Sequence, residues 1–252
     1  MNAVKYEIVV ILFPGPPDMK RFYIFMLSLL LCGKATSQED HYSFYQLYQL
    51  DSIGHSPSIG RHFGDLYYHF LLLVEKQLKK SDTTTERLVR NFETVFAKLY
   101  IDACIAYKNG EQIRLPEWRK YFSDSTLQPI QYYLLGANAH LNGGLSVAIA
   151  GSYTPEEWKT VKKKYYLFNV CLNKTYKYVY EKAVNENKRA RLLGILTLGF
   201  DKLIGNFYLY KWRKRQMRLV EYAFDNSPKY SALLTTVNRK KEKIDHMVIS
   251  QF

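Results

Sequence analysis

The sequence predicts an all-α protein, a single-domain bundle of about six to eight helices. Apolar residues recur at the 3.6-residue helical period over most of the chain, and no segment alternates apolar and polar residues as a half-buried strand would. The chain has 252 residues, of which 47% are hydrophobic and 23% are charged. That composition supplies enough apolar material for a full core, so one domain is expected.

Residues 1–37 are predicted to target the protein for export rather than to form part of the fold. Read from Met19, which we expect to be the true start, the chain has the order of a cleavable signal peptide. A basic pair, a short apolar run and small residues at the cleavage position follow one another: Lys20-Arg21, Phe22–Leu31 and Ala35–Ser37. The mature protein would begin at Gln38 and reside in the periplasm or outside the cell.

The cysteines raise two separate questions, namely lipid attachment at Cys32 and a disulfide between Cys104 and Cys171. A lipoprotein anchored through Cys32 is the less favoured form of export, because Leu29–Leu31 lacks the small residues that such a site prefers. After removal of the signal peptide only Cys104 and Cys171 remain. Both lie in apolar helical patterns, as two buried free thiols or as one disulfide, and their spacing does not decide between these.

The first half of the mature chain contains two clear helices. Residues 38–60 are polar, aromatic and interrupted by Gly and Pro, which predicts a segment that packs loosely over a helical domain of residues 61–252. Apolar stripes at helical spacing predict helices over 61–80 and 85–107. Asn109-Gly110 then provides a C-terminal stop.

The second half begins with a short helix over 116–122 and a longer apolar helix over 131–150. Adjacent glycines, Gly143 and Gly144, predict a break or kink in the longer helix. Thr154-Pro155-Glu156-Glu157 is a capping box with proline at the first helical position. Further helices are predicted from this cap to Asn185, over Arg189–Phe224 and over Ser231–Ile249.

The strongest candidate for chemistry is His140, which lies between Asn138 and Asn142 on a nearly uncharged apolar run. On a regular helix the two amides would not share a face with the imidazole, but an unwound turn at the glycines would let two of these groups converge. Buried amides and imidazoles need hydrogen-bond partners, so the cluster is either a structural network or a catalytic site. In the catalytic interpretation His140 is the base and the two amides orient the substrate.

Metal binding has weaker support. His62, Asp65 and His69 fall at i, i+3 and i+7 on one helical face, a spacing that can present ligands to a divalent cation. The same spacing is typical of an exposed polar face. The sequence has no CxxC pair, so a thiolate zinc site is not expected.

Three carboxylates stand out because of their apolar surroundings: Glu93, Asp102 and Asp201. Such a group can carry a raised pKa and act as an acid or base, although it more often pairs with Arg or Lys. Motifs for a serine nucleophile, a phosphate loop, a zinc protease helix and a dinucleotide site are missing.

The net charge of +13 suggests anionic partners, such as a membrane surface or a glycan. The basic residues are dispersed over helices, in groups at Lys162–Lys164, Lys211–Arg218 and Arg239–Lys243, which we interpret as solvated helix faces. This dispersal, with tyrosines at core spacing, argues against a nucleic-acid partner.

The segment LLGANAHLNGGLSVAIA resembles the central NAHIN-x-DLP-like stretch of an uncharacterised bacterial family of the DUF5995 type. The flanking stretches FETVFAKLYIDACIAY, PEWRKYF and LQPIQYY are similar to that family too. The resemblance spans roughly residues 60–225 and implies a helical single-domain fold with Asn138, His140 and Asn142 at its centre, but no established reaction. This chain departs from the pattern at Gly144, where the family tends to have Asp, and at Ser146, where it tends to have Pro.

These observations lead to two hypotheses about function. In the first, the protein is exported and carries a polar pocket around His140 that binds an unknown small molecule, with hydrolase-like or lyase-like chemistry. In the second, it is a non-catalytic binding or structural protein of the cell envelope, in which the His140 cluster only stabilises the core. Whether the chain is an enzyme is left open by the sequence.

Overall fold

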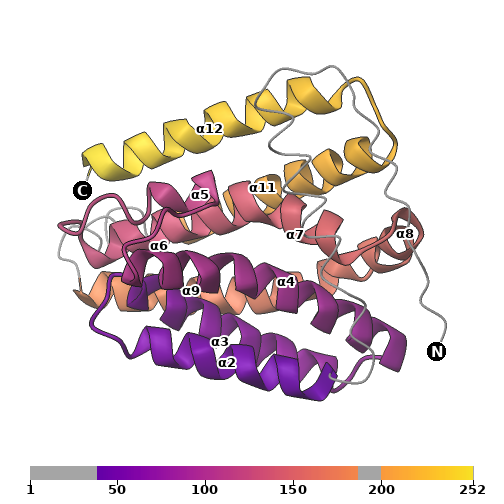
Figure 1. The fold of residues 1–252 in the computed structure, drawn as a ribbon, viewed down its shortest axis with the longest axis horizontal. Helices are drawn as coiled ribbons and strands as arrows, with labels where there is room; N and C mark the ends of the chain where they lie inside the picture. The colour runs from indigo at the N-terminus through magenta and orange to yellow at the C-terminus, as the bar shows by residue number, and fades with distance from the viewer. Residues whose placement is uncertain (1–38, 187–199, 252) are drawn as a thin grey trace, which may run out of the picture. The chain divides into compact units, whose positions relative to one another are not determined.

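The computed structural model describes residues 39–186 and 200–251, all within one compact unit of residues 35–252. Within these ranges the chain forms helices and no strand, so the predicted all-α fold is confirmed (Figure 1). The predicted signal peptide, Cys32 and residues 189–199 lie outside the described residues. The elements are α2 (Glu39–Gly54), α3 (Arg61–Leu78), α4 (Thr83–Lys108), α5 (Pro116–Arg119), α6 (Pro129–Asn138), the π-helix η1 (Ala139–Gly144), α7 (Leu145–Ser152), α8 (Pro155–Lys162), the 3₁₀-helix η2 (Tyr165–Phe168), α9 (Asn169–Glu186), α11 (Phe200–Phe224) and α12 (Tyr230–Gln251).

Of the described helices, α2, α3 and α4 lie along one side of the bundle, where α2 packs on both α3 and α4 (Figure 1). The helices predicted over 61–80 and 85–107 are present as α3 and α4. Asp82 caps α4, since its carboxylate accepts a hydrogen bond from Thr85 N at 2.9 Å. The expectation of a loose segment over 38–60 is wrong, because most of it forms α2, which packs on α3 and α4. Leu50 of α2 is fully buried and Gln46 donates to Thr94 O at 3.1 Å.

The predicted helix from Thr154 to Asn185 is interrupted. Its start is confirmed: Glu157 N donates to Thr154 Oγ1 and Thr154 N to the Glu157 carboxylate. The chain then leaves α8, passes through η2 and re-enters a helix as α9. Arg213 of α11 donates a hydrogen bond to Tyr165 O at 3.0 Å. A side chain from another helix therefore pairs with a backbone carbonyl group at this break.

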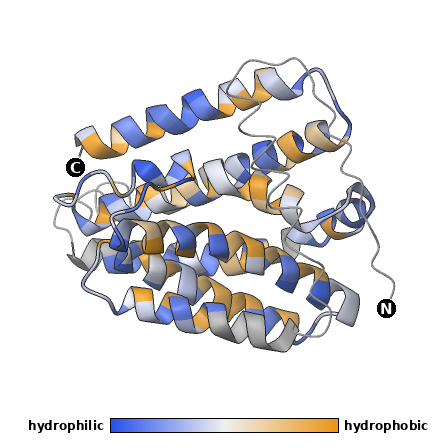
Figure 2. Ribbon diagram, in the orientation of Figure 1, coloured by the Kyte–Doolittle hydropathy of each residue, from blue (hydrophilic) through white to orange (hydrophobic). Residues whose placement is uncertain are grey.

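The last two described helices, α11 and α12, run antiparallel and pack on each other (Figure 1). The middle of α12 is hydrophilic, as Figure 2 shows, and most of its basic residues are exposed as expected. Two basic residues depart from the interpretation of solvated faces: Arg213 and Lys241 are buried. Both have polar partners: Arg213 bonds to Tyr165 O, and Lys241 pairs with Asp245 of the same helix.

Two further properties bear on the sequence analysis. Cys104 and Cys171 are free thiols. Among the described residues, no helix combines the length and the apolar composition needed to cross a bilayer.

Two helical glycines provide a matched test of the packing around the central helix. A Cβ at Gly136 of α6 would lie 2.6 Å from Phe63 Cγ in the core, whereas one at Gly151 of α7 would have its nearest neighbour at 3.6 Å. We therefore expect Gly136→Ala to lower the free energy of unfolding by about 1–3 kcal/mol, through overpacking. Gly151→Ala should leave it unchanged or raise it by about 0.5–1 kcal/mol. Urea denaturation of both variants measures this; equal effects would contradict the packing described.

Candidate functional site

The centre of the protein is one long helical segment that contains a π turn. α6 ends at Asn138, η1 occupies Ala139–Gly144 and α7 follows directly. Gly143 permits the close approach of α5, because a Cβ there would lie 2.6 Å from Glu117 Cβ. The break predicted at the two glycines is therefore present as a π-helical turn, a feature that disturbs the regular backbone hydrogen bonds of a helix.

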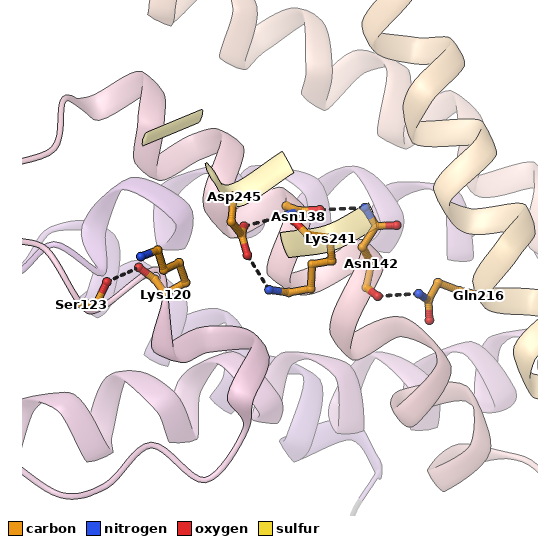
Figure 3. A network of polar contacts seen from close by, with 7 residues as sticks. All are labelled: Lys120, Ser123, Asn138, Asn142, Gln216, Lys241 and Asp245. Carbon is orange, nitrogen blue, oxygen red and sulfur yellow. Dashed lines mark hydrogen bonds and ion pairs between the residues drawn. The ribbon is translucent and has the colours of Figure 1, made fainter. Parts of the chain in front are cut away.

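The two asparagines beside His140 form a buried network with α12 (Figure 3). Asn142 Nδ2 donates to Asn138 Oδ1 at 2.7 Å, and Asn138 Nδ2 donates to Asp245 Oδ1 at 2.7 Å and to Lys241 O at 3.0 Å. Lys241 Nζ completes the network by pairing with Asp245 Oδ2 at 2.7 Å. All four side chains are buried, so each polar group here depends on the others for its partners.

Gln216 of α11 extends this network to the backbone of the π turn. Its Nε2 donates to Asn142 O and its Oε1 accepts from Ser146 N at 3.3 Å. A regular α-helix would join that carbonyl and that amide directly. The Gln216 side chain bridges them instead, and so stabilises the π turn from outside; Figure 3 shows its bond to Asn142.

His140 lies on the other side of the same turn, about half a helical turn away from both amides. Its ring stacks on Phe96, with ring centroids 3.5 Å apart, and meets Tyr67 edge-on at 4.4 Å. Neither ring nitrogen has a hydrogen-bond partner among the described residues. Burial holds the pKa of His140 well below its usual value, so the imidazole is neutral.

A cavity of about 780 Å³ lies beside His140. Its walls come from α3, α4, α6, η1, η2, α9, α11 and α12, and they are mainly aliphatic and aromatic. On the α3 and α4 side most lining residues, such as Phe63 and Val74, are almost fully buried, whereas Leu66 and Phe70 are partly exposed. Toward α6, α9 and α12 they become partly exposed, and Met247 of α12 reaches 47% exposure. The volume falls within the range of about 300–1,000 Å³ typical of small-molecule sites.

Glu93 of α4 is the acidic residue among the described cavity walls. Burial is the main cause of its strongly raised pKa, with Glu75 adding to the effect, and this favours the neutral form of the carboxyl group. Among the described residues no side chain donates a hydrogen bond to it. The nearby Tyr67 hydroxyl also lacks a partner there. The cavity therefore has uncharged polar groups in an apolar wall.

The structure separates the predicted catalytic trio into two groups. Asn138 and Asn142 come together and face α12, whereas His140 lines the cavity and contacts neither amide through a hydrogen bond. Sequence reasoning did not find Gln216 or Asp245, because these partners are distant along the chain. The signal for Asp245 was a single acid four residues after Lys241, which by itself is typical of a surface ion pair.

The candidate metal ligands have other contacts. His62 stacks on Tyr132 with centroids 5.1 Å apart, and His69 stacks on Tyr178 at 4.1 Å. Asp65 pairs with Lys182 Nζ at 2.7 Å. Burial, Arg61 and Lys182 together lower the pKa of His62 to about 4, and these two cations oppose metal binding there. Within the described residues no three His, Cys, Asp or Glu side chains are grouped to hold a metal.

Of the two other carboxylates singled out in the sequence, Asp102 is not among the described residues that line the cavity. It pairs with Lys98 at 2.7 Å on the surface of α4. The Asp201 side chain lies outside the described residues. Glu93 has the raised pKa that apolar surroundings can produce.

The model of a protein family described as "Family of unknown function (DUF5995)" matches residues 50–251. The chain belongs to this family. No curated protein and no solved structure matches this DUF5995 chain significantly. The chain departs from the central pattern at two positions. Gly144 packs near Leu99, and the backbone amide of Ser146 donates a hydrogen bond to Gln216 Oε1.

The environment of His140 predicts the effect of removing its ring nitrogens. We expect His140→Phe to keep or raise the free energy of unfolding at pH 7, by up to about 1–3 kcal/mol, because two unsatisfied buried polar atoms are lost. Wild-type stability should fall as pH decreases through 6.5, because the unfolded chain takes up a proton that folded His140 does not. His140→Phe should reduce that dependence on pH. Urea denaturation between pH 5 and pH 8 measures both effects.

His246 is exposed, so His246→Phe provides the matched control for loss of a histidine. This variant should retain the wild-type dependence on pH. A strong loss of stability in His140→Phe, with an unchanged dependence on pH, would show that the imidazole has an essential hydrogen-bond partner.

Proposed function

We propose that this DUF5995 protein binds an apolar small molecule in the cavity beside His140, without transforming it. The observation that carries the proposal is the cavity itself: about 780 Å³ in volume, with mainly aliphatic and aromatic walls drawn from helices along the whole chain. An apolar ligand would remove this surface from water and gain dispersion contacts with the walls.

The mainly apolar lining supports binding of an apolar group. Burial raises the pKa of Glu93 and lowers that of His140, which favours the neutral form of both side chains. The buried cation in the wall, Arg213, already donates hydrogen bonds to Tyr165 O and Asn169. An apolar lining with few polar groups is typical of small-molecule sites.

Hydrolase-like or lyase-like chemistry with His140 as base remains the second candidate, favoured by its place in the cavity wall. A general base needs a nitrogen within hydrogen-bond reach of the substrate, usually with the other nitrogen oriented by a partner. Both His140 nitrogens are covered by neighbouring atoms and lack such a partner in the described structure. Binding therefore accounts for more of the observed geometry than catalysis does.

A larger side chain placed in the cavity wall should occupy the space of the ligand and weaken its binding. Leu134 of α6 lines the cavity, whereas Leu72 of α3 is 42% exposed and lies outside it. We expect the uncharged dye 1-aminoanthracene to bind wild-type protein saturably, with brighter and blue-shifted fluorescence. Leu134→Trp should weaken that binding ~10-fold or more, which is over 1.4 kcal/mol, and the matched Leu72→Trp should not. Absence of saturable binding, or equal effects of the two variants, would contradict the proposal.

Export is the second part of the proposal and rests on the sequence of residues 1–37 alone. The basic pair, the apolar run and the small residues before Gln38 support it. We expect protein recovered from outside the cytoplasm to begin at Gln38, as measured by mass spectrometry of its N-terminal peptide. Recovery only from the cytoplasm, with the N-terminus intact, would refute export.

A further inference from the structure

One stripe of α12 faces the cavity and changes character along its length. The α12 residues that line the cavity are Lys240, Lys243, Ile244, Met247 and Val248. Their spacing of three and four places them on a single helical face. The first two are basic and exposed, and the last three are apolar. The wall of the cavity is therefore basic toward the start of α12 and apolar toward its end.

Arg215 of α11 adds a third cation to the basic end. Arg215 lies nine residues before Phe224, where α11 ends. Lys240 lies ten residues after Tyr230, where α12 begins. Because the two helices are antiparallel and in contact, these positions lie at a similar height along the pair. Arg215 also lines the cavity and is partly exposed. We call Arg215, Lys240 and Lys243 the basic rim.

The basic rim has no acidic counterpart in the described structure. None of the ion pairs between described residues includes a member of the rim. Lys241, which lies between the two rim lysines in sequence, points elsewhere and pairs with Asp245. Unpaired cations at the edge of an apolar cavity attract an anion and leave an apolar chain to occupy the interior.

The opposite wall differs in charge. α4 carries Glu93 and lies on the other side of the bundle from α12, which packs on α6, η1 and α11 (Figure 1). The cavity lining near Glu93 includes the buried rings of Phe92 and Phe96. Burial raises the pKa of Glu93 and favours its neutral form, and the buried Arg213 is held by Tyr165 O and Asn169, so this end is mainly apolar. The cavity thus has a cationic end near solvent and an apolar end in the core.

We infer that the ligand is a long-chain carboxylate, with its head group at the basic rim and its hydrocarbon chain directed toward α3 and α4. The inference rests on the proposed function, since it specifies the ligand of the same cavity. A guanidinium matches the two oxygens of a carboxylate in a bidentate pair, and two lysine ammonium groups add charge-assisted hydrogen bonds. The chain replaces water along Ile244 and the aromatic wall.

The test compares two fluorescent ligands that differ only in the head group, parinaric acid and parinaryl alcohol, on the protein from Gln38 onward at pH 8. We expect the acid to bind ~10-fold more tightly than the alcohol at low salt, a difference that charge-assisted hydrogen bonds supply. The preference should shrink as salt screens the rim. Equal binding of acid and alcohol would overturn the inference while leaving the apolar cavity site intact.

Charge reversal locates the head group. Lys240→Glu/Lys243→Glu should remove the preference for the acid and leave binding of 1-aminoanthracene within about twofold. Lys159→Glu/Lys163→Glu on exposed positions outside the cavity lining is the control of equal charge, and should keep the preference. A preference retained by the rim variant, or lost equally in the control, would overturn the inference. Failure of all three ligands to bind wild-type protein would instead reject the proposed function.

Discussion

Polar contacts around one π turn fix the two C-terminal helices to the centre of the protein. A π turn replaces i→i+4 backbone bonds by i→i+5 bonds, and this shift leaves backbone groups at its end that need outside partners. Gln216 supplies them from α11, and the pair Lys241–Asp245 on α12 satisfies the amide of Asn138. The two C-terminal helices are thereby fixed to the central helix by polar contacts. Because the contacts are buried and mutually dependent, loss of one member would leave others without partners.

This arrangement gives the two sides of the central helix different roles. On one side Asn138 and Asn142 form the buried network with α12, whereas on the other His140 forms part of the cavity wall. Lys241 and Asp245 hold one face of α12 against the central helix. The neighbouring face of α12 is thereby turned toward the cavity. The basic rim at Lys240 and Lys243 is in this sense a consequence of the network. The buried network and the proposed binding site therefore share α12.

Local patterns predicted much of the fold and part of the site. The helical period found α3 and α4, the capping box found α8, and the glycine pair marked the π turn, because each depends on neighbouring residues. Interactions between distant segments could not be predicted in that way. The break at Tyr165 depends on Arg213, and the partners of Asn138 lie over a hundred positions away. The cavity is formed by eight elements at once, so no single stretch of sequence contains it.

A crystal structure of the protein with a long-chain carboxylate bound would decide whether the cavity holds such a ligand. We predict continuous density for the hydrocarbon chain between α3, α4 and α9, passing His140 without displacing Asn138 from Asp245. We predict the carboxylate at Arg215, Lys240 and Lys243. A cavity filled by the protein's own side chains, or a ligand bound only at another surface, would contradict this prediction.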